Sequence, residues 1–234
     1  MSQEQVIRER VAEIRQRIHE LADGRRVKLM AVTKFHTREE AEWAIAAGVD
    51  LIGENRVQEA LQKWKASPPA VPLHDIGHLQ TNKVKYAIEL FDSIDSVDSD
   101  RLVDLLDRTA SRPFNVMLEV NVGSEESKYG LAPEAVRPYI ELAGRLHHVR
   151  IRGLMTVLPA RRENSVEEER RIRRHMQEMV DLWRMCRSEG WSWAPLEELS
   201  MGMSGDWEWA VEAGATLIRV GTGIFGPRAY ASRG

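Results

Sequence analysis

The feature that most constrains the fold of this chain is a repeated unit, in which a short apolar segment is followed by a polar turn and an amphipathic helical segment. We predict strands at 28–33, 51–53, 73–76, 93–96, 115–121, 151–155, 198–200 and 216–220. We predict helices at 3–23, 38–47, 56–67, 81–90, 99–111, 133–146, 165–190 and 206–213. Strands that alternate with helices form parallel sheets. Eight of them favour a closed (β/α)8 TIM-type barrel with an extra N-terminal helix over an open doubly wound sheet.

Length and composition agree with one barrel. The 234 residues suit a single domain, 1–234, and the loops at 68–72 and 161–165 are too short to be interdomain linkers. A net charge of −3 with 43% hydrophobic residues predicts a soluble globular protein whose partners are neither nucleic acid nor a membrane. Cys186 is the only cysteine, which fits a reducing compartment. No apolar segment follows Met1, so we expect a cytoplasmic protein that is a monomer or a weak dimer.

One lysine stands where the first strand ends. The run LMAV at 29–32 is typical of a strand buried on both faces, and Lys34 follows its carboxyl end. In barrels of this kind that end carries the chemistry, and a desolvated ε-amine there can attack a carbonyl group. The alternative is a surface lysine that extends into water, and the stretch by itself favours this alternative.

Three other strand ends carry polar side chains. Asn55 follows the second strand and could either cap the next helix or reach into the barrel mouth. His78 follows the third, where it could stack on a flat ligand, and Gly77 before it allows close backbone approach. Lys128 lies in the polar loop after the fifth. Taken singly, His78 is more simply a structural histidine and Lys128 a surface charge.

The last two strands are followed by glycine-rich turns. One contains Met201 and Ser204, and the other follows Arg219 and contains Gly221 and Thr222. Phosphate sites in such barrels are often built from these two loops, although two tight turns are the simpler interpretation of each loop alone. A lysine that can form a Schiff base and a phosphate cradle together describe a site for pyridoxal 5′-phosphate (PLP).

These motifs occur in order along nearly the whole chain. They are AVTK at 31–34, IGENRVQE at 52–59, HDIGHLQTNK at 74–83, EVNVGSEESKYGL at 119–131, GLM at 153–155, LSMGMSGDW at 199–207 and IRVGTGIFGPR at 218–228. In this set the chain resembles the pyridoxal phosphate homeostasis protein family.

The resemblance implies an alanine-racemase-like PLP-binding barrel of fold type III, with the vitamin B6 cofactor PLP held as an internal aldimine on Lys34. It places the cofactor phosphate near Ser204 and the pyridine nitrogen near Arg219. A guanidinium hardly ever gives up a proton, so the ring nitrogen would stay unprotonated and the cofactor would be a weak electron sink. We predict no metal ligand and nine cofactor-binding residues: Lys34, Asn55, His78, Lys128, Met201, Ser204, Arg219, Gly221 and Thr222.

The chain also departs from the family pattern. Many members carry a second lysine two residues after the aldimine lysine, where this chain has His36. Many members have a tyrosine where this chain has Arg56, which could hold an anion or be plain helix surface.

The resemblance favours a carrier that buffers PLP or delivers it to apo forms of PLP-dependent enzymes, without strong catalysis of its own. The alternative is an amino-acid racemase, which needs an acid/base on each face of the substrate α-carbon. In alanine racemases the second base is a tyrosine from an additional domain of another subunit, and we expect no such domain in this chain, which ends at Gly234. Tyr230 is the one nearby substitute. A cofactor-free Schiff-base aldolase fits Lys34 but leaves Arg219 without a role.

Overall fold

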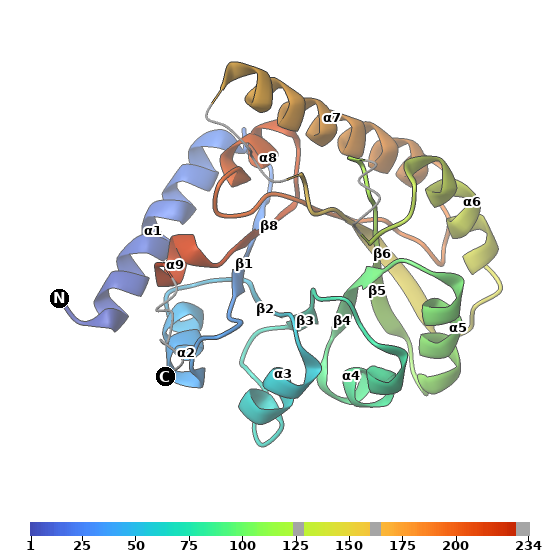
Figure 1. Ribbon diagram of the computed structural model, residues 1–234, viewed down its shortest axis with the longest axis horizontal. Helices are drawn as coiled ribbons and strands as arrows, with labels where there is room; N and C mark the ends of the chain where they lie inside the picture. The colour runs from blue at the N-terminus through green and yellow to red at the C-terminus, as the bar shows by residue number, and fades with distance from the viewer. Residues whose placement is uncertain (124–128, 160–164, 228–234) are drawn as a thin grey trace.

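The chain folds into a closed barrel of eight parallel strands (Figure 1). The computed structural model describes residues 1–123, 129–159 and 165–227. The strands are β1 Lys28–Val32, β2 Leu51–Glu54, β3 Leu73–Asp75, β4 Ser93–Val97, β5 Phe114–Glu119, β6 Val149–Met155, β7 Glu198–Ser200 and β8 Leu217–Val220. Each strand pairs with the next, and β8 pairs with β1 from Lys28–Leu217 to Ala31–Val220, which closes the sheet. The predicted fold class is confirmed.

Helices surround this barrel (Figure 1). They are α1 Gln3–Leu21, α2 Arg38–Ala46, α3 Val57–Trp64, the 3-10 turn η1 Thr81–Lys83, α4 Val84–Leu90, α5 Asp100–Thr109, α6 Pro133–Ala143, α7 Val166–Ser188, α8 Trp207–Ala213 and α9 Thr222–Phe225. The predicted helix at 81–90 begins as a 3-10 turn, and the short helix α9 is absent from the sequence prediction. None of the helices in the described ranges combines the length and apolar character that crossing a membrane requires.

Alternate residues of each strand face two different layers. Leu29 and Ile52 belong to the large apolar layer between the barrel and its helices. Their neighbours face the barrel interior, where one cluster contains Met30, Leu51, Met117, Met155 and Leu217. This alternation follows from the two-residue repeat of a strand. This cluster fills the middle of the barrel interior. Residues two positions further along the strands face the mouth at the carboxyl ends.

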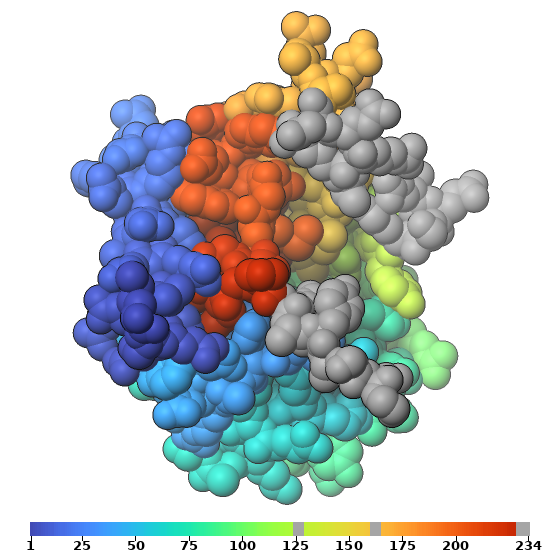
Figure 2. Space-filling view, turned by 60° about the vertical axis from the view of Figure 1, so that its left-hand side comes forward, coloured from blue at the N-terminus to red at the C-terminus, as the bar shows by residue number. Residues whose placement is uncertain are grey.

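The N-terminal helix supports the end of β8. The side chain of Ser2 caps α1 by accepting a hydrogen bond from the Gln5 N–H, and one face of the helix is buried. This face packs on α2, α8 and α9, and Figure 2 shows the blue N-terminal segment against the red end of the chain. Arg10 donates from Nη1 to the Ile224 carbonyl over 3.2 Å, which ties α1 to α9.

Candidate functional site

The backbone around Lys34 is held by polar contacts on both sides. Lys34 lies two residues beyond the end of β1 and is half-buried. Before it, buried Thr33 donates from Oγ1 to Glu54 Oε1 over 2.7 Å. After it, Phe35 adopts a left-handed backbone (φ 67°), and its N–H donates to Glu59 Oε1 over 2.5 Å. These contacts fix the main chain that carries the lysine.

The loops after β7 and β8 meet at one hydroxyl group. Ser204 Oγ accepts hydrogen bonds from the N–H groups of Gly221 at 3.3 Å and Gly223 at 3.2 Å. Glycine is required at 223, because a Cβ there would lie 2.7 Å from Val220 Cγ1. A Cβ at Gly221 would lie 3.5 Å from Val32 Cβ, so this turn adjoins the strand that leads to the lysine. Main-chain donors and a hydroxyl group are thus gathered beside the end of β1.

Arg219 lies inside the barrel, with its residue only 3% exposed. It follows inward-facing Leu217 by two positions on β8. Its Nη1 donates to Ser200 Oγ over 2.6 Å, and its Nη2 donates to the Thr156 carbonyl over 2.8 Å. Burial lowers the pKa of Arg219 from its ordinary value, but three carboxylates oppose this effect and favour the charged form. They are Asp95, Asp206 and Glu119.

Glu119 is an acidic group at the mouth that the sequence interpretation did not single out. It ends β5, two residues after inward-facing Met117. The pKa of Glu119 is raised to about 7, because burial and the negative charge of Asp98 raise it more than the positive charge of Arg219 lowers it. The signal was available, because Glu119 begins the quoted motif at 119–131 and continues the inward-facing alternation.

Asn55 is not the cap of the helix that follows it. Arg56 occupies the N-cap position of α3 and makes no capping hydrogen bond with its side chain, so the capping interpretation of Asn55 is wrong. Asn55 is half-buried at the end of β2 instead. The predicted close approach at Gly77 is confirmed, because a Cβ there would overlap the Asn55 carbonyl oxygen. The exposed Arg56 guanidinium lies 5.7 Å from the centre of the Phe35 ring.

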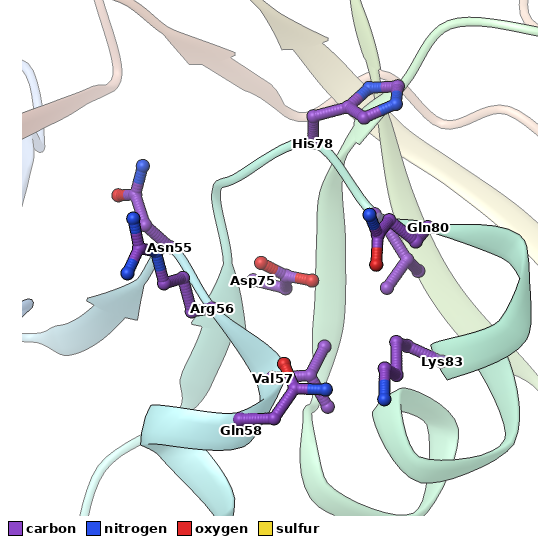
Figure 3. Close-up of a pocket in the computed structure, with 9 residues that line it drawn as sticks. Asn55, Arg56, Val57, Gln58, Asp75, His78, Gln80 and Lys83 are labelled. Atoms are coloured by element: carbon purple, nitrogen blue, oxygen red, sulfur yellow. The ribbon is translucent and has the colours of Figure 1, made fainter.

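His78 is exposed at the rim of the mouth. Its ring stacks on Tyr129 with 3.9 Å between ring centroids, and its Nδ1 lies 3.7 Å from Asp98 Oδ2. A flat surface for stacking is therefore present, and its partner here is an aromatic side chain of the same protein. In Figure 3 Asn55 and His78 stand on two sides of a cavity that opens beside the mouth.

The remaining predicted site residues lie in different surroundings. Thr222 is exposed at the first position of α9. The side chain of Met201 is fully buried in the apolar layer between barrel and helices. Lys128, which we predicted to bind the cofactor, and Tyr230, the alternative base, lie outside the described residues.

His36, which stands where many family members have a lysine, packs within the protein. Its ring stacks on Phe225 of α9 with 4.3 Å between centroids. Its Nδ1 lies 3.5 Å from Glu40 Oε1. The structure thus places His36 between α2 and α9.

Comparison with known proteins gives relatives along almost the whole chain. The family described as alanine racemase, N-terminal domain, matches residues 4–229. The pyridoxal phosphate homeostasis protein of Aquifex aeolicus is 39% identical over 87% of this chain and 88% of its own length. The protein of the same name from Pseudomonas aeruginosa is 37% identical over 96% of both chains.

Solved structures give the same result. PipY of Synechococcus elongatus with PLP bound is 36% identical, with a TM-score of 0.79 over 94% of this chain and all of that one. The alanine racemase of Corynebacterium glutamicum shares the fold with a TM-score of 0.73 but is only 16% identical, and 62% of that chain is covered. The identity of 37–39% to the pyridoxal phosphate homeostasis proteins extends over most of the chain, whereas the alanine racemase shares only the fold. The chain therefore belongs to the pyridoxal phosphate homeostasis protein family.

Proposed function

We propose that this protein binds pyridoxal 5′-phosphate as a Schiff base on Lys34 and buffers or delivers the cofactor in the cell. The observation that carries this proposal is the meeting of two loops at Ser204, beside the strand that leads to Lys34. PipY, solved with PLP bound, is similar to the chain along nearly its whole length. The curated relatives are named for PLP homeostasis.

The residues at the mouth fit the parts of this cofactor. A phosphate group needs several hydrogen-bond donors, and we assign the hydroxyl groups of Ser204 and Thr222 to it. The N–H groups of Gly221 and Gly223, which donate to Ser204 Oγ in this structure, hold the Ser204 hydroxyl group in place and leave its proton to donate. When bound, PLP supplies an aldehyde that a lysine ε-amine can attack. Lys34 is the residue that we assign to this attack, which forms a carbon–nitrogen double bond and releases water.

The remaining contacts favour binding over catalysis. We assign the guanidinium of Arg219 to the ring nitrogen, where it keeps that nitrogen unprotonated and so limits withdrawal of electrons from a bound amino acid. Ser200 and Thr156 hold the guanidinium from the barrel interior. We assign Asn55 and His78 to the rim, and Lys128 and Met201 to the cofactor-binding set on the family resemblance alone. The amino-acid racemase remains the alternative that the experiments must exclude.

The proposal extends to partners and place of action. A carrier of a reactive aldehyde would deliver it to apo forms of PLP-dependent enzymes, acting in the cytoplasm as a monomer or a weak dimer. The single cysteine, Cys186, is buried and agrees with a reducing compartment.

Absorption spectroscopy with covalent trapping tests this function. We expect the purified protein, or the protein after incubation with PLP, to absorb in the near-visible range. Borohydride should remove this band and leave the cofactor mass on the peptide that contains Lys34. Lys34→Ala should lose the covalent adduct and retain some phosphate-held cofactor. Lys65→Ala is the matched control, because the exposed Lys65 directly follows the last residue of α3, and its loss should leave the adduct unchanged. A protein that cannot be loaded, or an adduct on another lysine, would contradict the proposal.

A further inference from the structure

A tight turn carries Lys34 just after the end of β1. The turn runs from Thr33 to His36 and is closed by a hydrogen bond from the His36 N–H to the Thr33 carbonyl over 3.0 Å. Phe35, its third residue, has a left-handed backbone (φ 67°), which residues other than glycine seldom adopt. Such a backbone persists only where surrounding groups hold it, and it is common at functional sites. The groups that hold this turn therefore decide how Lys34 is presented to the mouth.

Both peptide groups next to Lys34 are bonded to side chains of α3. The carbonyl of the preceding peptide group, which belongs to Thr33, accepts a hydrogen bond from Lys63 Nζ over 2.8 Å. The N–H of the following peptide group, which belongs to Phe35, donates to Glu59 Oε1 over 2.5 Å. Lys63 and Glu59 are four positions apart and share one helix face, with 3.5 Å between Nζ and Oε1. One face of α3 thus holds the main chain on both sides of Lys34.

The ammonium group of Lys63 is buried, and each of its three protons has an acceptor nearby. The side chain is only 7% exposed, and its remaining acceptor is Glu54 Oε1, over 2.7 Å. Glu54 is itself fully buried, and its Oε1 also accepts from Thr33 Oγ1 over 2.7 Å and from Trp64 Nε1 over 3.4 Å. Thr33 is therefore bonded to this ion pair through both its carbonyl and its hydroxyl group.

Stability alone does not account for the ion pair of Glu54 and Lys63. The second carboxylate oxygen of Glu54, Oε2, is buried and has no hydrogen-bond partner among the described residues. Removing charges from water costs free energy, and an unpaired buried oxygen adds to this cost. Apolar side chains of similar volume in place of a buried ion pair are often as stable or more stable. What apolar side chains could not provide is a donor to the Thr33 carbonyl.

We propose that Lys63 and Glu59 are positioning residues, with Glu54 holding Lys63, and that they place the ε-amine of Lys34 for attack on the aldehyde of bound PLP. This inference rests on the proposed function. In the reaction the amine nitrogen forms a double bond to the aldehyde carbon, and the aldehyde oxygen leaves as water with the two amine protons. Misplacing a reacting group by about 1 Å can slow a reaction about a hundredfold. Loss of the positioning should therefore slow Schiff-base formation and leave non-covalent binding of PLP unchanged.

The double variant Glu54→Gln/Lys63→Met separates positioning from stability. It removes both buried charges together, so we expect it to unfold in urea at a concentration close to that of the wild type. After mixing with PLP, its near-visible absorption band should appear about ten- to a hundredfold more slowly. Non-covalent PLP affinity, measured by equilibrium dialysis in the Lys34→Ala background, should stay unchanged. Lys65→Met is the matched control, because the exposed Lys65 directly follows α3 and its loss should not alter the rate.

Variants at Glu59 test the same role with the buried ion pair intact. Glu59→Ala removes the acceptor of the Phe35 N–H and should slow Schiff-base formation by about tenfold, because a hydrogen bond to a charged group is lost. Glu59→Gln keeps an oxygen acceptor at this position and should restore most of the rate. The Phe35 amide should exchange with deuterium faster in Glu59→Ala than in the wild type, and this measurement does not require PLP.

The two proposals fail in different ways. A wild-type protein that takes up no PLP would contradict the proposed function, whereas deuterium exchange at Phe35 would still test the positioning. Equal exchange at Phe35 in Glu59→Ala and the wild type would overturn the positioning role, as would wild-type rates of Schiff-base formation in both Glu59→Ala and the double variant. A rate that falls only in proportion to stability or to non-covalent affinity would also overturn it, because the ion pair would then be merely structural.

Discussion

The guanidinium of Arg219 donates a hydrogen bond to the hydroxyl group of Ser200 over 2.6 Å inside the barrel. Both residues are buried, and they lie on neighbouring strands, β8 and β7. The hydroxyl group fixes one edge of a charged group that we assign to the ring nitrogen of the cofactor. Ser200 is therefore the residue whose loss should alter both stability and the cofactor environment.

Ser200→Ala should lower the free energy of unfolding by about 1.5–3 kcal/mol, because it removes a hydrogen bond to a buried charge. Urea denaturation measures this change, and the absorption band of the loaded protein should shift as well. Ser188→Ala is the control, since the exposed Ser188 hydroxyl bonds only to the Met185 carbonyl among the described residues. Its effect should stay within about 0.5 kcal/mol. Equal stability losses in both variants would contradict the assigned role.

Ser204→Ala and Thr222→Ala should each weaken PLP binding by about tenfold or somewhat more, because each removes a hydroxyl group near a charged acceptor. Equilibrium titration followed by absorbance measures this affinity. Thr109→Ala is the control, because it removes an exposed hydroxyl group on α5, outside the loops after β7 and β8, and should leave the affinity for PLP unchanged. If Ser204→Ala and Thr222→Ala both bind PLP with wild-type affinity, the phosphate site must lie elsewhere.

The free energy of unfolding should depend on the protonation of Glu119 between about pH 4.5 and pH 7. Its pKa rises from about 4.5 to about 7 on folding, so between these pH values the folded protein holds more protons than the unfolded chain. Stability contributed by this group should therefore fall as the pH rises from about 4.5 to 7 and remain level above it. Glu119→Gln should make the decline shallower in urea denaturation at pH 5 and pH 7.5. Glu13→Gln, at an exposed position on α1, is the control and should show the same change in stability with pH as the wild type. If Glu119→Gln also shows the wild-type change, Glu119 is not the group responsible.

Deuterium exchange separates the carrier from the racemase. With one well-placed base and an unprotonated ring nitrogen, incubation of the loaded protein with L- and D-amino acids in deuterated water should give little or no α-deuterium exchange. Mass spectrometry of the amino acids measures this exchange, and transfer of cofactor to an apo-enzyme can be followed in parallel. Rapid exchange that disappears in Tyr230→Phe would make the protein a compact racemase.

The local pattern was sufficient to predict most elements. Strand β7 was predicted with its observed bounds, 198–200, and α2 differs from its prediction by one residue. The run at 29–32 and the lysine after it could be recognised because a buried strand excludes polar residues over several positions. The prediction of helix 56–67 extended beyond Trp64, where the observed helix ends. Its segment continues into the proline-containing loop at 68–72.

Contacts between distant segments were decided only by the tertiary structure. The helix α9 contains a glycine and two β-branched residues in four positions, so its helix propensity is poor. The hydrogen bond that Arg10 donates to the Ile224 carbonyl comes from the other end of the chain. Thr156 reaches Arg219 across 63 positions of sequence. A local sequence pattern cannot predict a contact between residues so far apart in the chain.

The chain order of the motifs was enough to predict the barrel and its lysine, because strand and helix periods are local properties. The raised pKa values of Asp75 on β3 and Glu119 on β5 were not predictable in this way, because the pKa of a carboxyl group depends on burial and on charges brought near it by other strands. The junction of Ser204 with Gly221 likewise required β7 and β8 to lie side by side in the closed barrel.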